Sequence, residues 1–465
     1  MKLKTKLLIF PIFLGLIFGM VFSINEVNAS NINAVYVVSV DDNALTIFDV
    51  SDVLDISHIG EITGSGPPNF LNYVSDIFVS GSYAYCVSYD DNALTIFDIS
   101  DVDNIEHISQ ITGVGSPNYL GGADALVVAN GYAYIVSGWD DALTIFDVSN
   151  PTNPIHVGEI TGAGSPNRLD GATGIDLAGD YAFVVSATDN ALSIFDVSNP
   201  TNPTLEGTVT GIGSPNYLNG VRNVIVNNEY AYTVSKNDDA LSIFNVTDKT
   251  NPTVLGSITG EGSPNYLNGA YNLDLNGNYV YIASSNDNAL VIINATDKTS
   301  PSLLGQIHGD GFPNYLNGAV DVNVYGDYAY VCSGLDDALS IFDISDHENP
   351  ILEDVITGSG SPNYLNGAEN LFFGSYTPSE DEGDTISNLI LDFFLYAVFF
   401  LIIPLTIVYY VGGIENPSLG IAAFIGAETL MGAITLKIGY IDLWFMIAIL
   451  VLDVFLIVTM IKNRM

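Results

Sequence analysis

A phrase of eight residues returns every 49 residues along most of the chain, and this repeat limits the fold more than any other feature. The copies are ALTIFDVS, ALTIFDIS, ALTIFDVS, ALSIFDVS, ALSIFNVT, ALVIINAT and ALSIFDIS. Their central residues are Phe48, Phe97, Phe146, Phe195, Phe244, Ile293 and Phe342. A period of about 40 to 50 residues is typical of propellers, solenoids and arrays.

Each repeat holds four short runs rich in β-branched and aromatic residues, separated by turn-forming residues. In the third copy the predicted strands are Ala123–Ala129, Tyr132–Ser137, Leu143–Val148 and Ile155–Thr161. No helical period appears between them. Seven units of four strands predict an all-β, seven-bladed propeller over residues 30–376.

The two ends of the repeat region predict how the ring closes. The chain enters at Ala34–Val40, which matches the second strand of a blade, and leaves at Ala368–Gly374, which matches a first strand. One blade would then combine strands from both ends, leaving no unpaired edge. A solenoid is the alternative, but it needs atypical capping repeats and none is visible.

The repeat phrases LTIFDVSNPTNP at 143–154 and LSIFDVSNPTNP at 192–203 give the region a family resemblance. Over residues 34–375 the chain resembles the LVIVD-repeat family. The resemblance implies a secreted or surface propeller and no particular reaction. The first two copies lack the prolines of the phrase, which alters one loop and leaves the strand count unchanged.

The N-terminal residues 1–29 have the features of a secretory signal peptide. A lysine-rich start precedes an apolar run at 7–22, and Val27-Asn-Ala29 fits a cleavage site. An uncleaved membrane helix is the alternative. Either one sends the propeller outward.

After an acidic linker at 377–387, the chain becomes strongly apolar. Residues 388–465 predict three transmembrane helices, at about 388–411, 418–436 and 441–461. Three crossings would leave the basic tail inside a cell or virion membrane and the propeller outside. Glu428 and Asp453 fall near the middle of two crossings, where ionisable residues favour assembly with membrane-protein partners over ion conduction.

Acidic residues dominate the charge of the chain. Asp and Glu outnumber Lys and Arg by 53 to 11, for a formal net charge of −42. Binding to nucleic acid is therefore not expected, because phosphate recognition needs clustered basic residues. The charge favours cations or basic partners.

The loop between the second and third strands carries an aspartate in all seven copies. A ring of such carboxylates could bind Ca²⁺, but no copy has the spacing of a dedicated calcium loop. A role in the turn is the favoured alternative, and no cofactor is firmly implied. These residues are Asp42, Asp91, Asp140, Asp189, Asp238, Asp287 and Asp336.

Departures from the repeat predict where a ligand would bind. At the start of the first strand one position reads Ser75, Asp124, Thr173, Arg222, Tyr271, Val320 and Glu369 around the ring. Neutral drift is the alternative to a ligand site at the mouth of the central channel. Arg168 replaces an aromatic residue in a long loop, and Trp139 stands where other copies have Asp, Thr, Asn or Leu. The candidate ligand-binding residues are Asp124, Trp139, Arg168, Arg222 and Tyr271.

No catalytic motif is present in the sequence, so the chain is predicted not to be an enzyme. Two sequons, at Asn245 and Asn294, are possible glycosylation sites. The predicted function is a membrane-anchored, surface-exposed binding or adhesion module for a glycan or a protein. The alternative is an exterior structural subunit of a larger membrane complex, assembled through the three C-terminal helices.

Overall fold

The computed structural model describes residues 32–376. The predicted signal peptide, acidic linker and transmembrane helices, with Glu428 and Asp453, lie outside the described residues and remain predictions. Within the described part of the chain, no helix is long and apolar enough to cross a membrane.

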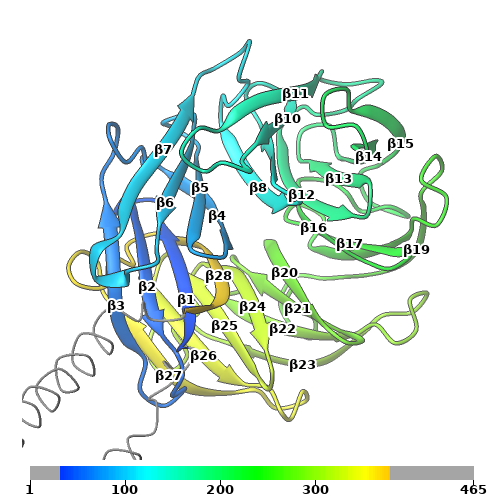
Figure 1. Cartoon of the computed structure of the whole chain (residues 1–465). Helices are drawn as coiled ribbons and strands as arrows, with labels where there is room; N and C mark the ends of the chain where they lie inside the picture. Colours follow the sequence, from blue (N-terminus) through cyan, green and yellow to red (C-terminus); the bar gives the residue numbers. More distant parts are fainter. Residues whose placement is uncertain (1–31, 377–465) are drawn as a thin grey trace, which may run out of the picture. The chain divides into compact units, whose positions relative to one another are not determined.

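The described residues form seven four-stranded antiparallel sheets arranged as blades around a central axis, which confirms the predicted propeller (Figure 1). The innermost strands of neighbouring blades contact one another around the ring. A single turn of 3-10 helix, η1 (Val102–Asn104), is the only helix in this region. From the innermost strand outward, blade 1 consists of β28 (Ala368–Tyr376), β1 (Ile32–Ser39), β2 (Ala44–Asp49) and β3 (Ser57–Thr63), and blade 2 consists of β4 (Val74–Ser80), β5 (Tyr83–Ser88), β6 (Ala93–Asp98) and β7 (Glu106–Thr112). In the same order, blade 3 consists of β8 (Ala123–Ala129), β9 (Tyr132–Ser137), β10 (Ala142–Asp147) and β11 (Ile155–Thr161); blade 4 of β12 (Ala172–Ala178), β13 (Tyr181–Ser186), β14 (Ala191–Asp196) and β15 (Thr204–Thr210); and blade 5 of β16 (Val221–Asn227), β17 (Tyr230–Ser235), β18 (Ala240–Asn245) and β19 (Thr253–Thr259). Blade 6 consists of β20 (Ala270–Asn276), β21 (Tyr279–Ser284), β22 (Ala289–Asn294) and β23 (Ser302–His308), and blade 7 of β24 (Ala319–Tyr325), β25 (Tyr328–Ser333), β26 (Ala338–Asp343) and β27 (Ile351–Thr357).

Blade 1 closes the ring in the way the two ends of the repeat predict. Its innermost strand β28 comes from the C-terminal side and pairs antiparallel with β1, with Ala34 opposite Gly374 and Val37 opposite Leu371. The predicted strands of blade 3 also agree with the structure, except that β10 begins and ends one residue earlier. The Val148 N–H donates to Gly131 O at 2.8 Å, which continues the pairing of β9 with β10 by one bond beyond the end of β10.

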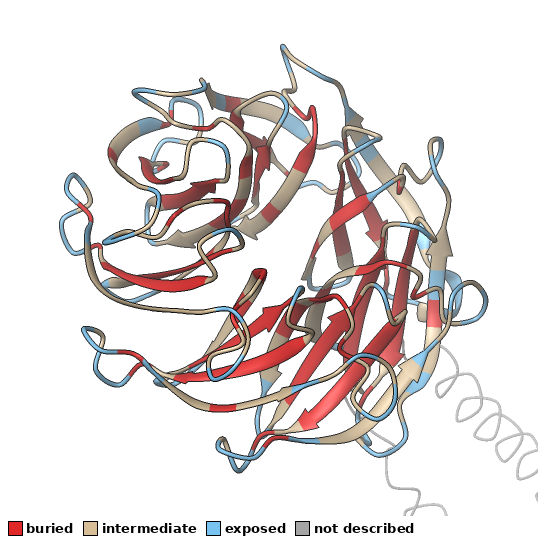
Figure 2. Ribbon diagram, turned by 180° about the vertical axis from the view of Figure 1, so that it is seen from behind, coloured by how far each residue is buried: buried red, intermediate tan, exposed pale blue. Residues whose placement is uncertain are grey.

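The hydrophobic core is divided among the seven interfaces between blades. Each cluster draws buried residues from two neighbouring blades, and one of them joins blade 7 to blade 1. The repeated residue represented by Phe146 is completely buried in every copy. Burial is concentrated in the second and third strands of each blade, while the outermost strands and the loops are more exposed (Figure 2). No blade therefore has a core of its own.

The repeated aspartates join the loops at one end of the propeller. In blade 2, Asp91 Oδ2 accepts hydrogen bonds from Gly66 N and Asn72 N, both at 2.9 Å, and so holds the long loop that enters its own blade. The adjacent Asn92 has a φ of 52°, and its Oδ1 accepts from Gly122 N of the next loop at 3.0 Å. All seven aspartates make the same double contact. Each pair of residues thus binds two consecutive loops.

Replacement of one such aspartate should destabilise the ring. Asp287 Oδ2 accepts from Gly262 N at 2.8 Å and Asn268 N at 2.9 Å, so Asp287→Ala leaves two backbone donors unpaired. We expect the free energy of unfolding to fall by about 1–3 kcal/mol. Asp287→Asn, whose amide oxygen can accept both bonds, should cost less. Urea unfolding of both variants measures this, and equal losses would contradict the assigned role. Repeating the series with Ca²⁺ and with a chelator tests the calcium prediction.

Candidate ligand site at the channel mouth

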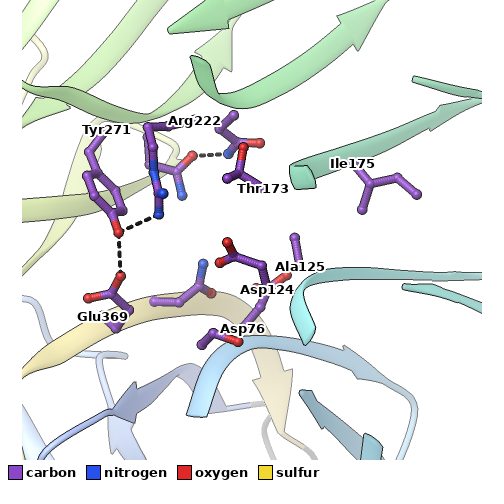
Figure 3. Close-up of a pocket in the computed structure, with 12 residues that line it drawn as sticks. Asp76, Asp124, Ala125, Thr173, Ile175, Arg222, Tyr271 and Glu369 are labelled. Carbon is purple, nitrogen blue, oxygen red and sulfur yellow. Dashed lines mark hydrogen bonds between the residues drawn. The ribbon is translucent and has the colours of Figure 1, made fainter. Parts of the chain in front are cut away.

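A cavity of about 120 Å³ opens at the channel mouth, where the innermost strands begin. Six of the seven innermost strands supply its lining, and β24 does not (Figure 3). The lining residues are Ser75, Asp76, Asp124, Ala125, Thr173, Ile175, Arg222, Asn223, Tyr271, Asn272, Glu369 and Asn370.

Two small residues make room for this cavity. The innermost strands differ at the residue that follows the variable position of Asp124 and Arg222. There, five blades carry Asp or Asn, whereas blades 3 and 4 carry Ala125 and Gly174. The larger side chains hydrogen bond around the ring: Asn223 donates to Asn272, and Asn272 Nδ2 donates to Asp321 Oδ1 at 2.5 Å. That chain of bonds has no counterpart at Ala125 and Gly174. The cavity therefore lies where the repeat loses its polar side chains.

Arg222 is the basic residue of the cavity. Its Nη2 donates to the Tyr271 hydroxyl at 2.6 Å, and the guanidinium carbon lies 4.3 Å from the centre of the Tyr271 ring. The same hydroxyl donates to Glu369 Oε1 at 2.7 Å. Nε of Arg222 is buried and has no hydrogen-bond partner, and among the described residues no carboxylate forms an ion pair with Arg222. The cavity thus holds a guanidinium whose donors are only partly used.

Carboxyl groups occupy the opposite side of the cavity. In Figure 3, Asp124 points across the open space toward Arg222. Burial raises the pKa of Asp124 to about 6, an effect that Arg222 opposes and Glu369 adds to. Burial also raises the pKa of Glu369, although Tyr271, Arg222 and Lys236 all act to lower it. Groups with shifted pKa values that gather in one cavity are typical of functional sites.

Further carboxyl groups of the channel hold neighbouring blades together. Asp76 Oδ1 accepts from Ile77 N at 2.8 Å, and its Oδ2 accepts from Leu126 N of the next blade at 2.7 Å. Asp176, Asp274 and Asp321 make the same pair of contacts. Burial raises the pKa of Asp76 to about 7 and those of Asp176 and Asp274 to about 6.

Three of the five predicted ligand residues, Asp124, Arg222 and Tyr271, line the cavity. Trp139 lies at the rim, where its ring centre is 4.6 Å from that of Tyr89. Arg168 lies in the long loop before blade 4, outside the lining, with a φ of 53° and a half-buried side chain.

Sequence reasoning missed Glu369, Asp76, Tyr73 and Tyr89. Glu369 stands in the same variable row as the selected residues. Tyr73 replaces a glycine found in the other six copies, so comparison at the 49-residue spacing could have found both.

The remaining predicted sites are spread around the ring. The seven loop aspartates lie in seven different loops, and within residues 32–376 no three His, Cys, Asp or Glu side chains form a group that could hold a metal ion. Asn245 and Asn294 end strands β18 and β22, and each Oδ1 accepts from the backbone N–H two residues later, at 2.9 Å. Their glycosylation stays a prediction.

The repeat is matched by the family model described as the LVIVD repeat, at residues 72–105, 120–161, 171–211, 220–259, 269–308 and 318–356. These segments make up just over half of the chain. The chain belongs to the LVIVD repeat family. A comparison with curated proteins finds no similar sequence.

Solved propellers share the fold of this LVIVD repeat protein at low sequence identity. A protein from Lactobacillus plantarum aligns with a TM-score of 0.61 and 12% identity over 74% of this chain and 99% of its own. A Bacteroides fragilis protein with a provisional assignment as a 6-phosphogluconolactonase aligns with a TM-score of 0.60 and 12% identity over 75% and 99%. The Pseudomonas aeruginosa periplasmic gluconolactonase gives 0.56 and 13% over 74% and 99%. At these identities the likeness shows the fold alone.

These structures correct the prediction that the chain is not an enzyme. That prediction was wrong because it relied on the absence of short catalytic motifs, and propellers of the same fold include proteins named as lactonases. In a propeller, groups that act together can come from separate blades, and they then leave no linear motif.

The raised pKa values predict an unusual dependence of stability on pH. An acid with a higher pKa in the folded chain contributes stability below its unfolded pKa and loses it as the pH rises through the folded value. For Asp76, Asp124, Asp176 and Asp274 that window runs from about pH 4 to about pH 7. The melting temperature should therefore rise by several degrees between pH 7.5 and pH 5.

Calorimetric melting temperatures of two variants show how much the buried carboxyl groups contribute to the pH dependence. Asp274→Asn should reduce the pH dependence, because it removes one titrating group from the channel. Asp297→Asn is the control: the Thr299 hydroxyl and N–H lower the pKa of Asp297, which therefore stays charged across this range. A melting temperature that falls on acidification, or equal slopes in the two variants, would disprove the explanation.

Proposed function

We propose that this protein is a carbohydrate-binding module displayed outside a cell or virion membrane, with its binding site at the channel mouth. The observation that carries the proposal is Arg222: a buried guanidinium that lines the cavity opposite Asp124, makes one hydrogen bond from Nη2 to Tyr271, and forms no ion pair with the described residues. A buried donor without a partner costs stability, and a ligand that accepts from it would remove that cost.

The chemistry of the cavity suits hydroxyl groups. Carboxylates such as Asp124 and Glu369 accept hydrogen bonds, while the guanidinium of Arg222 donates them. A hydroxyl group both donates and accepts, so neighbouring hydroxyls of one sugar ring can satisfy both sides of the cavity. Asn223, Asn272 and Asn370 add amide groups to the same lining.

The charge of the propeller favours a neutral ligand over an anion. Between residues 32 and 376 the sequence contains 43 acidic and five basic residues. This field repels phosphates, nucleic acids and acidic polymers. Inside the cavity, Arg222 and the nearby Lys236 partly offset the carboxylates, so that an uncharged sugar enters without a large electrostatic cost.

The placement of the module is proposed from the flanking sequence. The predicted signal peptide would export the propeller, and the predicted C-terminal helices would retain it at the membrane. Cell adhesion or capture of a glycan chain would then be the role of the exposed channel mouth.

A glycan array probed with full-length protein in mild detergent tests the proposal. We expect selective binding of neutral glycans. Arg222→Met, which keeps the length of the side chain but removes its donors, should weaken that binding by about tenfold or more, since a charge-assisted hydrogen bond contributes about 1.5–3 kcal/mol. Lys298→Met removes a positive charge from an outer loop and is the control.

Two results would overturn the proposal: a folded wild-type protein that binds no glycan, or full binding by Arg222→Met. Glucono-δ-lactone belongs to the same class of polyhydroxylated rings and is included as a soluble probe. Its hydrolysis, followed by acid release, shows whether the site also carries a reaction of the kind named for the solved propellers.

A further inference from the structure

Three aromatic side chains form a continuous wall at the rim of the cavity, on blades 2 and 3. This aromatic wall consists of Tyr73, Tyr89 and Trp139. The ring centres of Tyr73 and Tyr89 are 5.7 Å apart, and those of Tyr89 and Trp139 are 4.6 Å apart. The three rings therefore contact one another in a row, although Tyr73 and Trp139 remain open to solvent.

Tyr73 has a backbone conformation that its side chain does not favour. Its φ is 52°, and the six equivalent residues are glycines, namely Gly122, Gly171, Gly220, Gly269, Gly318 and Gly367. Bulky residues rarely adopt this left-handed region, and strain of this kind gathers at functional sites. The ring nevertheless remains 43% exposed, so burial does not repay the strain.

Trp139 occupies the space above Gly122, in the loop that enters its own blade. A Cβ atom added at Gly122, the equivalent of Tyr73 in blade 3, would lie 2.9 Å from Trp139 Cγ. The indole thus rests on the backbone of that loop and is still 55% exposed. Tyr73 forms one end of the wall on blade 2, and Gly122 leaves room for Trp139 at the other end on blade 3.

The aromatic wall lies outside the lining of the cavity, next to residues that belong to it. Tyr73 lies two residues before Ser75, and Gly122, beneath Trp139, lies two residues before Asp124; both Ser75 and Asp124 line the cavity. Burial raises the pKa of Tyr73, and the charges of Glu369 and Asp124 raise it further, which places its hydroxyl within electrostatic reach of the lining.

The cavity is small compared with the wall beside it. Its volume of about 120 Å³ is well below the roughly 300–1,000 Å³ of pockets that enclose a drug-sized ligand. One sugar unit at most fits among Arg222, Asp124 and Glu369. Any larger ligand must continue over the rim, and the exposed rings there offer apolar area at little entropic cost.

We propose that the aromatic wall is a second subsite, which binds the sugar unit next to the one held in the cavity. The site then recognises the end of a neutral glycan chain of at least two units. This inference rests on the proposed function, and it adds the length of the ligand and the residues that read it.

Paired sugars test the inference by titration calorimetry on the full-length protein. Each monosaccharide is compared with disaccharides that carry the same unit at the non-reducing end: glucose with maltose and cellobiose, galactose with lactose, N-acetylglucosamine with chitobiose, and mannose with mannobiose. For the sugar that binds, we expect the disaccharide to bind about tenfold more tightly, equivalent to about 1.4 kcal/mol. Trp139→Ala should abolish that difference.

Leu335 provides the matched control. It occupies the position of Trp139 in blade 7, rests on Gly318 in the same way and is 72% exposed. Leu335→Ala should preserve the preference for the disaccharide. Because the chain has two tryptophans, Trp139 and Trp444, a Trp444→Phe protein reports the wall directly. Its fluorescence should change with the disaccharide and much less with the monosaccharide.

Tyr73→Gly separates binding from stability. It restores the residue of the other six copies, so the melting temperature should rise as backbone strain is relieved. The affinity for the disaccharide should fall in the same variant. A purely structural Tyr73 would give the opposite change in melting temperature.

The outcomes distinguish the two proposals. If a monosaccharide binds in an Arg222-dependent manner but no disaccharide binds more tightly, or if Trp139→Ala keeps the preference, the second subsite is wrong and the proposed function stands. If neither monosaccharides nor disaccharides bind the folded protein, both proposals fall together.

Discussion

The pairing of β28 with β1 is the constraint on which the rest of the structure depends. Each hydrophobic cluster is shared by two blades, so blades 1 and 7 have no complete interface until the C-terminal strand is in place. The same pairing delivers Glu369 to the Tyr271 hydroxyl, 98 residues away in sequence, and so completes the hydrogen-bonded side of the cavity. Closure of the ring and assembly of the channel mouth are therefore one event.

Residues that recur in every blade and residues that differ from the repeat have different structural roles. The loop aspartates and the residues that follow them bind backbone N–H groups in the same way in every blade, so they hold the loop end of the ring together. Uniform contacts of this kind cannot create a single binding site. The cavity arises where two blades carry Ala125 and Gly174 in place of Asp or Asn, and the aromatic wall arises where blade 2 carries Tyr73 in place of glycine.

The sequence was sufficient to predict what depends on period and local pattern. Strand number, blade composition and ring closure follow from the 49-residue spacing, because every copy repeats the same local order of strands and turns. The site was predicted only in part. Asp124, Arg222 and Tyr271 were found as departures at one position, but Tyr73 and Trp139 are 66 positions apart on different blades, and only the ring shows that they share a rim. Reasoning from missing motifs failed for the same reason, since side chains that meet in a propeller need not be close in sequence.

Electrostatic balance at the channel mouth limits which ligands the site can accept. Burial opposes the charges of Asp124, Glu369 and Arg222, and each of the three offsets that cost for another. An incoming anion would compete with the carboxylates for Arg222 and would first cross the field of a strongly acidic domain. An incoming cation would compete with Arg222 for Asp124 and Glu369. A neutral ligand with several hydroxyls would satisfy the unused donors and acceptors without disturbing that balance, and this is the physical ground on which we propose a sugar over a charged metabolite.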